Sequence, residues 1–386
     1  MKNIKVKKKS ITKIIIVFFL FYNSFKPDEK MEIKKYLNIC NKKEISNIYH
    51  YQNNKTPKVS IISPVYNREK YLIRFINSIQ NQQLNDFEIL FVDDSSKDNS
   101  CKIIEDCQKI DERILLIKNR KNRGTFISRN IGVLKSKGKY IMLPDPDDIL
   151  FKNIIQDCYD IAENNNYEMI RFNIYLGNGK IFFSEIVNNL KSIPIYQPDL
   201  SRYLFYGLGK LREIDFNISN KFIKRSSFII ALNYLEKYYL NLYSLIYEDG
   251  LMNFILYRTV KSLYFLKKIG YYYILDDGSL TKRGNIDLDK FLKFLYIYSK
   301  IVFDYTKNTF YEKSMVTSLL DEYLKLNNRN IISFILNDFY FYNNTDYKFY
   351  NYFMNIYLES KFTDFRNKAS IIKIKNIIKN ITKNLK

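Results

Sequence analysis

The segment FEILFVDDSSKDNS, residues 87–100, decides the fold more than any other stretch of the chain. Its first six residues are largely apolar and include β-favouring types, which predicts a buried strand over residues 87–92. The polar residues 93–100 that follow are typical of a turn that caps a helix, and this helix is expected to run to about Ile110. The basic unit of the sequence is therefore a strand that ends in a carboxylate pair, Asp93-Asp94, and leads into a helix.

The same unit repeats on both sides of this segment. Short apolar runs predict strands over residues 59–63, 87–92, 113–118 and 140–143. Apolar residues at helical spacing predict helices over residues 69–81 and 124–135, besides the helix that ends near Ile110. Nearly continuous apolar strands that alternate with helices favour an α/β fold, in which a mostly parallel sheet carries helices on both faces.

Polar clusters stand where these predicted strands end. They are Pro64-Val65-Tyr66-Asn67, Asp93-Asp94, and Asp145-Pro146-Asp147-Asp148. Parallel sheets of this kind bind ligands beyond the carboxyl ends of their strands. Loops that only turn the chain do not need carboxylate pairs, so the coincidence predicts a binding site at this edge of the sheet.

The cluster at residues 145–148 has the chemistry of a divalent cation site. Asp145 and Asp147 are one residue apart at a strand end and can share a cation, directly or through water. Because no His or Cys is near, Mg²⁺ or Mn²⁺ is favoured over Zn²⁺, and the cation would neutralise a diphosphate leaving group. An Asp-x-Asp also occurs in plain turns, and Asp148 can instead begin a helix, where its charge is favourable.

Two further acidic points each have two interpretations. Asp93 can accept hydrogen bonds from a nucleobase N–H or a ribose hydroxyl, or it can cap the helix that follows. The pair Glu248-Asp249 can supply a general base that deprotonates an acceptor hydroxyl, or it can be a helix-capping acid. The sequence contains neither GxGxxG nor GxxxxGK[ST], so a Rossmann dehydrogenase and a P-loop NTPase are poor fits.

Composition limits the class of protein. The chain has 386 residues, 46% of them hydrophobic, which allows one large α/β domain with a smaller appendage or two domains. The net charge of +22 permits a nucleic acid, an anionic membrane or a polyphosphate-bearing partner, or it reflects a solvated, lysine-rich surface. No basic-aromatic motif is recognisable and the acidic clusters would repel phosphates without a metal, so we expect no nucleic-acid partner. The single histidine, His50, excludes a multi-histidine zinc site.

Residues 1–56 resemble a targeting segment. Basic residues precede an apolar run at 14–22, and a polar stretch follows. We expect a single-pass, uncleaved membrane anchor and a linker, which would place the protein at a membrane (an endomembrane in a eukaryotic cell). A cleaved signal, or an N-terminal helix of a soluble protein, are the alternatives, because the run is shorter than the ~20 residues of a comfortable span.

Four segments together resemble the family 2 glycosyltransferases of the GT-A fold. They are VSIISPVYN at 59–67, EILFVDDSSKDNS at 88–100, NRGTFISRNIG at 122–132 and GKYIMLPDPDD at 138–148. They occur in the family's order and at its spacing over about ninety residues. NKFIKR at 220–225 resembles the segment that follows the sheet in these enzymes, and GSLT at 278–281 resembles a late family element. The resemblance implies a Rossmann-like GT-A domain over residues 57–285, and residues 286–386 are expected to form a helical C-terminal extension.

The resemblance also implies roles for individual residues. Asp93 would bind the base, typically uracil, Asp147 would hold the metal, and Asp249 would be the general base of an inverting, single-displacement transfer from a UDP-sugar. The remaining donor-site residues are Pro64, Tyr66, Asn67, Glu69, Asp94, Arg123, Gly124, Arg129, Asp145 and Glu248. Lys282 and Arg283 would offset phosphate charge, an inference from their position in the sequence.

Two departures from the family pattern qualify this picture. Ser95 stands where glycine is common after the Asp pair. The absence of Trp removes the Gln-x-x-Arg-Trp motif of polymerising synthases, so transfer is expected to be non-processive, to a saccharide, lipid or protein acceptor. The alternative is a catalytically inactive binding or scaffold protein that keeps the fold, because fold alone does not imply function.

Overall fold

Four parallel strands form the first half of the sheet, as the alternating pattern predicts. In the computed structural model, β1 lies between β2 and β4, and β3 extends the sheet beyond β2. The elements of this half are β1 (Val59–Val65), α3 (Glu69–Gln80), β2 (Phe87–Asp93), α4 (Ser100–Gln108), β3 (Ile114–Lys118), α5 (Thr125–Lys135) and β4 (Tyr140–Met142). Their bounds differ from the predicted ones by one or two residues, which is the usual uncertainty of element ends.

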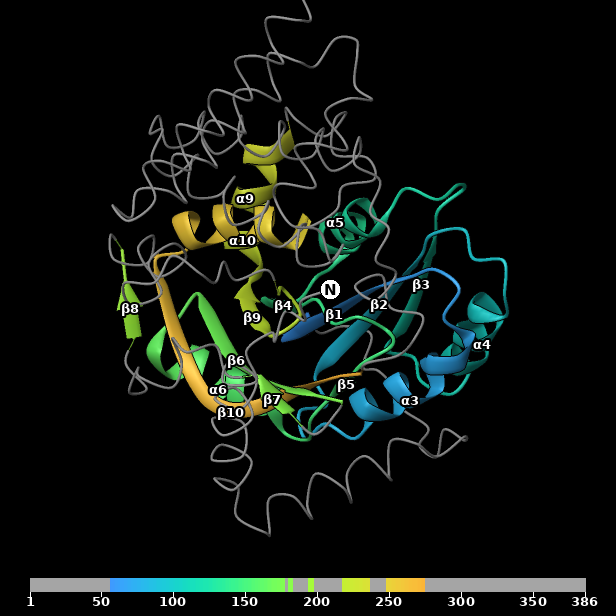
Figure 1. Cartoon of the computed structure of the whole chain (residues 1–386), viewed down its shortest axis with the longest axis horizontal. Coiled ribbons are helices and arrows are strands. Elements are labelled where there is room, and N and C mark those ends of the chain that lie inside the picture. Colours follow the sequence, from blue (N-terminus) through green and yellow to red (C-terminus); the bar gives the residue numbers. More distant parts are fainter. Residues whose placement is uncertain (1–55, 178–179, 183–193, 198–216, 237–247, 275–386) are drawn as a thin grey trace, which may run out of the picture. The chain divides into compact units, whose positions relative to one another are not determined.

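The second half of the sheet is mixed. The strand β9 inserts antiparallel between β4 and β6, and β6 runs parallel to β10, so the order is β3-β2-β1-β4-β9-β6-β10-β5 (Figure 1). The elements are β5 (Ile149–Leu150), α6 (Ile154–Asn165), β6 (Met169–Leu176), β7 (Lys180–Phe182), β8 (Pro194–Tyr196), β9 (Lys221–Lys224), α9 (Arg225–Glu236), α10 (Glu248–Thr259) and β10 (Ser262–Tyr273). The parallel character predicted for the sheet therefore holds for β1 to β4 and gives way to mixed pairing beyond them.

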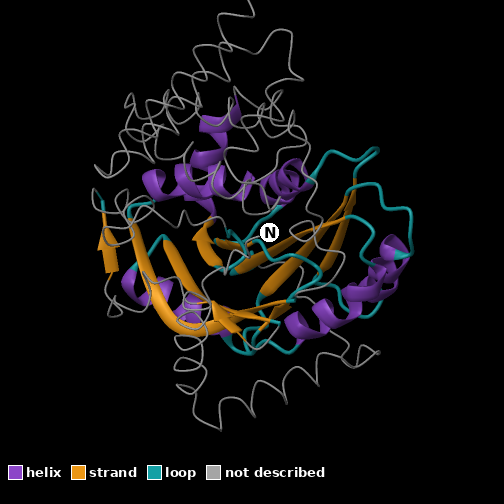
Figure 2. Ribbon diagram, viewed as in Figure 1, coloured by secondary structure: helices purple, strands orange, loops and turns teal. Residues whose placement is uncertain are grey.

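Helices cover both faces of the sheet (Figure 2). On one face, apolar side chains of α3, α4 and α6 share a core with alternate residues of the strands, among them Phe75, Phe91 and Phe172. The helix α5 packs on the other face, beside α9. A Cβ at Gly132 of α5 would stand 2.3 Å from a methyl carbon of Ile62, so this close approach of α5 to β1 requires glycine.

The structure describes residues 56–177, 180–182, 194–197, 217–236 and 248–274, all within one compact unit made of residues 1–203 and 215–276. Within these ranges no helix has the length and apolar character needed to cross a membrane. The proposed anchor at 1–56, His50, the segment 278–281, Lys282, Arg283 and the C-terminal extension lie outside the described residues.

Candidate functional site

The loops that follow β1 and β2 are joined to each other by side chains. Asn67 donates its backbone N–H to the Ser96 hydroxyl over 3.0 Å and accepts the Lys97 N–H on its Oδ1 over 2.8 Å. The Glu69 carboxylate accepts the backbone and amide N–H groups of Asn99 at 2.9 and 3.0 Å. Asn67 and Glu69, both expected at the nucleotide pocket, thus fix the two loops in one arrangement, whereas Tyr66 is exposed and Pro64 is buried in β1.

Asp93 ends β2 with one oxygen engaged and one open. Its Oδ2 accepts the backbone N–H groups of Ser95 and Ser96, each over 3.1 Å. Its Oδ1 is buried and has no hydrogen-bond partner among the described residues, although the Cys101 thiol contacts the same carboxylate. A buried acceptor without a donor is costly unless a ligand supplies one, so this oxygen is suited to an N–H or O–H of a bound molecule.

The neighbouring Asp94 has a different environment. Its two oxygens accept the amide of Asn119 and the backbone N–H groups of Arg123 and Gly124, at 2.7–2.9 Å. Gly124 has φ 82° and ψ 160°, a backbone conformation available almost only to glycine. Asp94 therefore positions the loop that begins α5, and the side chain of Arg123 is left exposed at its rim.

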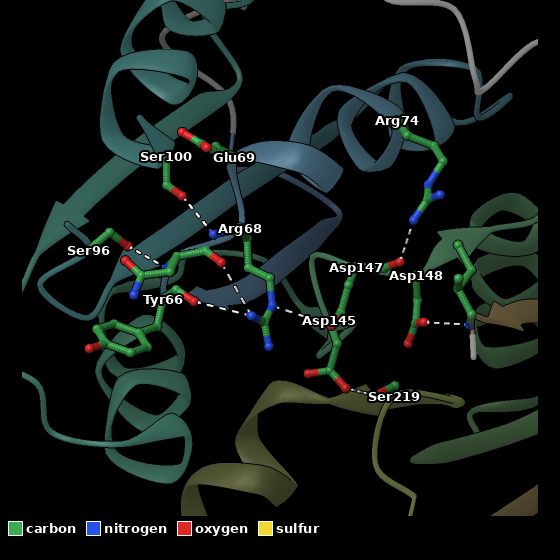
Figure 3. Close-up of polar contacts among 12 residues, drawn as sticks. Tyr66, Arg68, Glu69, Arg74, Ser96, Ser100, Asp145, Asp147, Asp148 and Ser219 are labelled. Carbon is green, nitrogen blue, oxygen red and sulfur yellow. Dashed lines mark hydrogen bonds and ion pairs between the residues drawn. The ribbon is translucent and has the colours of Figure 1, made fainter. Parts of the chain in front are cut away.

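The acidic cluster after β4 divides into a buried and a half-buried part. Asp148 is buried and accepts hydrogen bonds from the Tyr271 hydroxyl at 2.6 Å and the Ile274 N–H at 2.9 Å, which makes it a structural anchor to β10. Asp145 and Asp147 keep about 30% of their side-chain surface exposed. Figure 3 shows Asp145 directed toward Ser219 and Asp147 next to Arg68.

Arg129 of α5 joins the carboxylates into one cluster. Its side chain is only 6% exposed, and the guanidinium donates to Asp145 over 2.5 Å and to Asp249, which lies 120 residues further along the chain. Glu248 approaches the same guanidinium at 3.9 Å. The resemblance implies a place for Arg129 beside the nucleotide-sugar, and the structure shows it paired with Asp145 and Asp249, with Glu248 nearby.

The concentration of charge changes the acidity of these groups. Burial and the neighbouring Asp249 raise the pKa of Glu248 to about 8, while burial raises the pKa of Asp249 against the opposing effect of Arg129. Burial and Asp145 raise the pKa of Asp147. Burial alone would lower the pKa of Arg129, but Asp249, Asp145 and Glu248 outweigh it and raise that pKa, so the guanidinium stays charged.

Four contributors were not predicted from the sequence. Arg68 pairs with Asp147 through its Nε at 3.3 Å, and Arg74 donates to the Asp147 carbonyl at 2.8 Å. Ser219 donates to Asp145 at 3.3 Å, and the Tyr271 hydroxyl accepts the Asp145 N–H at 3.0 Å. Two local signals stood next to these residues: Arg68 directly follows Tyr66-Asn67, and Ser219 directly precedes the segment 220–225 that resembles a family element.

The residues present suit a hard divalent cation that is completed by a ligand. Among the described residues, no group of three or more His, Cys, Asp or Glu side chains is placed to hold a metal by itself. Magnesium-type ions are commonly bound by one or two carboxylates together with substrate phosphates and water. Asp147 is half-buried beside Asp145, and among the described residues its ion pair is made through Oδ2, which leaves Oδ1 for a metal ion. Asp147 therefore fits that requirement.

Comparisons with known proteins point in one direction. Residues 60–228 match the model of the family described as Glycosyl transferase family 2. An uncharacterized glycosyltransferase of Rickettsia bellii (strain RML369-C) is 40% identical over 110 residues, which cover 28% of this chain and 16% of that protein. Glycosyltransferase GlyG of Streptococcus pneumoniae serotype 4 is 32% identical over 117 residues, 30% of this chain and 39% of GlyG, so the chain spans less than two fifths of either relative.

The fold has a counterpart among solved structures. S. aureus TarS 1-349, crystallised in complex with UDP-GlcNAc, superposes with a TM-score of 0.57 at 16% identity. The match covers 78% of this chain and 81% of the TarS chain. At this identity the likeness establishes the architecture, which agrees with the predicted GT-A arrangement.

Proposed function

We propose, from the membership of residues 60–228 in glycosyl transferase family 2, that the protein transfers a sugar from a nucleotide-diphospho-sugar to an acceptor hydroxyl. The donor is proposed to be a UDP-sugar and the acceptor a saccharide, a lipid or a protein, with one sugar added per encounter. The observation that carries the proposal is the position of Arg129. It joins Asp145 at the end of β4 to Asp249 at the start of α10. One site therefore combines the edge of the sheet where the sugar donor would bind with a candidate general base.

The donor side of the proposal rests on Asp93. Its open Oδ1 is an acceptor in a buried position, which suits an N–H of a pyrimidine base better than an anionic or purely apolar group. The two peptide N–H groups on Oδ2 keep the carboxylate in place before any ligand arrives. That the TarS structure holds UDP-GlcNAc supports a uridine diphosphate donor for the shared fold.

Asp249 is proposed as the base of an inverting, single-displacement step. The acceptor hydroxyl gives its proton to the Asp249 carboxylate while its oxygen forms a bond to the anomeric carbon, and the bond from that carbon to the diphosphate oxygen breaks, so that the nucleoside diphosphate leaves. Asp249 suits this role better than Glu248, because Arg129 pairs directly with Asp249, whereas the pKa of Glu248 lies at about 8 and leaves it mainly protonated at neutral pH.

Asp147, with Asp145 beside it, would hold a Mn²⁺ or Mg²⁺ ion that offsets the charge of the departing diphosphate. The expected result is that EDTA abolishes nucleoside diphosphate release and that Mn²⁺ or Mg²⁺ restores it. Asp147→Ala should show the same loss without rescue. Full activity in EDTA, or in Asp147→Ala, would remove the metal from the proposal.

A nucleotide-sugar panel, read by release of the nucleoside diphosphate, is the direct test of transfer. Asp249→Asn should bind UDP-sugar with little change and lose transfer by about 10²-fold or more, the scale of a missing general base. Asp106→Asn, at an exposed position of α4, is the matched control and should transfer normally. Retained transfer by Asp249→Asn would show that another group takes the proton.

A catalytically inactive binding protein is the second candidate, and one observation favours it. The Arg68 guanidinium already provides a cation for Asp147. Donor binding without transfer to any acceptor, with or without added metal, would support this alternative. Membrane attachment through residues 1–56 stays a prediction, because those residues lie outside the described part of the chain.

A further inference from the structure

Arg68 lies between the loop after β1 and the acidic loop after β4. Its Nε is 3.3 Å from Asp147 Oδ2, and its NH1 donates to the carbonyl oxygens of Tyr66 at 3.4 Å and Asn67 at 3.3 Å (Figure 3). The guanidinium is therefore held on one side by two peptide carbonyls and on the other by a carboxylate. We infer that Arg68 is the counter-ion that Asp147 keeps while no donor is bound, and that Arg68 disfavours binding of a divalent cation until a diphosphate takes over the guanidinium.

The placement of Arg68 is built into the backbone around it. Asn67 adopts a left-handed conformation, with φ 53°, and the Arg68 N–H donates to the Ser100 hydroxyl over 2.8 Å. Arg68 occupies the N-cap position of α3 without capping the helix through its side chain. Its side chain is thus able to reach across to Asp147. The hydrogen bonds between the loops after β1 and β2 fix the position of the Arg68 backbone.

The partner of Arg68 is fixed as well. Arg74, six residues further along the chain in α3, donates to the Asp147 carbonyl over 2.8 Å, so the peptide that carries the carboxylate is tied to the same helix. Asp147 and Arg68 are each about 30% exposed, so both can be reached by an ion or a phosphate from solvent. The pair is held by the backbone on both sides and is open enough to be exchanged.

The geometry also leaves a place for phosphate on Arg68. Among the described residues, the contacts of the Arg68 guanidinium are made through its Nε and NH1, which leaves its terminal NH2 group for a ligand. Guanidinium groups bind phosphate oxygens in a planar, forked manner, whereas a single ion pair at a half-exposed position is weak. A diphosphate that enters beside Asp147 can therefore draw the guanidinium toward itself, which frees the Asp147 oxygen for the cation that accompanies the diphosphate.

This inference rests on the proposed function in taking Asp147 as the metal ligand and a diphosphate as part of the donor, and the two can be tested apart. Mn²⁺ binding is titrated by calorimetry or electron paramagnetic resonance, first without nucleotide and then with saturating UDP. The variants are Arg68→Met, Arg68→Gln, Asp147→Asn and, as a matched charge control on an exposed face of α4, Lys102→Met. Melting curves for each variant verify that it is folded.

Without nucleotide, the two Arg68 variants are expected to bind Mn²⁺ about three- to tenfold more tightly than the wild type, the scale of losing one half-exposed competing ion pair. Lys102→Met should match the wild type, and Asp147→Asn should lose the site. With UDP present, the order of affinities should reverse. The Arg68 variants lack the guanidinium that contacts phosphate, so they should bind UDP with Mn²⁺ about three- to tenfold more weakly than the wild type.

Each other outcome identifies which idea fails. Equal Mn²⁺ affinity in the wild type and the Arg68 variants, with binding lost in Asp147→Asn, would overturn the role of Arg68 and leave the metal site standing. Failure of every form to bind Mn²⁺, even with UDP present, would overturn both. Tighter Mn²⁺ binding by the Arg68 variants with unchanged UDP affinity would overturn the transfer of the guanidinium to phosphate.

Discussion

The carboxylates of β2 and the carboxylates of the β4–α10 cluster are held by different kinds of donor. Asp93 and Asp94 accept mainly peptide N–H groups from their own or neighbouring loops. Asp145, Asp147 and Asp249 are instead balanced by the guanidinium groups of Arg129 and Arg68. Peptide donors move only when a loop refolds, whereas a guanidinium changes partner by rotating a side chain.

This difference separates binding from chemistry in the proposed function. The β2 side presents a preformed acceptor, the open oxygen of Asp93, and needs no rearrangement to receive a base. The β4–α10 side has to accommodate a diphosphate and proton transfer, so exchangeable ion pairs suit it better. Substitutions at the end of β2 should therefore act mainly by altering loop structure. Substitutions in the β4–α10 cluster should act mainly by altering its charge balance.

The largest effect is expected from Arg129→Met. Removing this buried guanidinium leaves Asp145 and Asp249, both partly buried, without their paired cation, which should lower the free energy of unfolding by about 3–5 kcal/mol. Urea denaturation at pH 7.5 measures the loss. Lys109→Met, which removes an exposed ion pair with Asp106, should leave the unfolding midpoint in place. Equal midpoints for both variants would mean that the cluster does not depend on Arg129.

The positions of the acidic residues along the sheet could be predicted from the sequence, because strand ends are marked by local patterns. Asp93, Asp145 and Asp147 each follow an apolar run, and parallel strands bring such ends to one edge. The pairing of Arg129 with Asp249 could not be predicted, since it depends on where α10 packs, 120 residues away. Local periodicity carries no information on that contact.

The second prediction concerns pH and tests the charge of the cluster. The pKa of Glu248 is raised to about 8 in the folded protein from 4.5, so folded Glu248 keeps its proton while the unfolded chain loses it. Below pH 4.5 both states are protonated and the residue has no effect. Stability is lost as the pH rises from about 4.5 to 8, and the loss is complete above that range.

Glu248→Gln removes this penalty, so the variant should be more stable than the wild type at pH 8.5 and similar to it at pH 4.5. A pKa shift corresponds to about 1.36 kcal/mol of unfolding free energy per pKa unit. We expect the variant and the wild type to differ by only part of that sum, about 2 kcal/mol at pH 8.5, because the side chain is 17% exposed and keeps some hydration. Thermal unfolding across pH 4.5–8.5 provides the measurement. A difference that does not change with pH would show that Glu248 titrates normally.

The second half of the sheet marks another limit of the sequence. The strand β9 has only four residues and lies inside the sheet, antiparallel between β4 and β6, whereas the resemblance implied a segment that follows the sheet. Arg68 was missed for a different reason. Its side-chain direction depends on the left-handed backbone of Asn67, and the residue pattern around it does not specify that conformation.

The third prediction compares two adjacent carboxylates. Asp94→Asn places an amide N–H against a peptide N–H of the 119–124 loop and should cost about 1–3 kcal/mol of stability. Asp93→Asn can keep its oxygen on the Ser95 and Ser96 N–H groups, so its cost in stability should be smaller. It presents a donor where a base N–H is proposed to bind, so UDP affinity should fall about tenfold or more. Calorimetry with UDP and melting curves for both variants would show whether binding and structure separate in this way.

The smallest expected effect is at Ser95, the residue that departs from the glycine common in the family. Ser95 has φ 67°, a left-handed conformation that costs an L-residue about 1–2 kcal/mol. Ser95→Gly removes that cost but adds backbone freedom to the unfolded chain, worth about 0.5–1 kcal/mol, so a net gain of about 0.5 kcal/mol is expected. The Ser95 N–H that donates to Asp93 is kept in the variant, so UDP binding should not change.

Ser96→Gly is the matched control: it relieves no positive φ and removes the hydroxyl that accepts the Asn67 N–H, so it should lower the melting temperature. If Ser95→Gly is also destabilising, the Ser95 hydroxyl contributes more to this loop than its strained backbone costs.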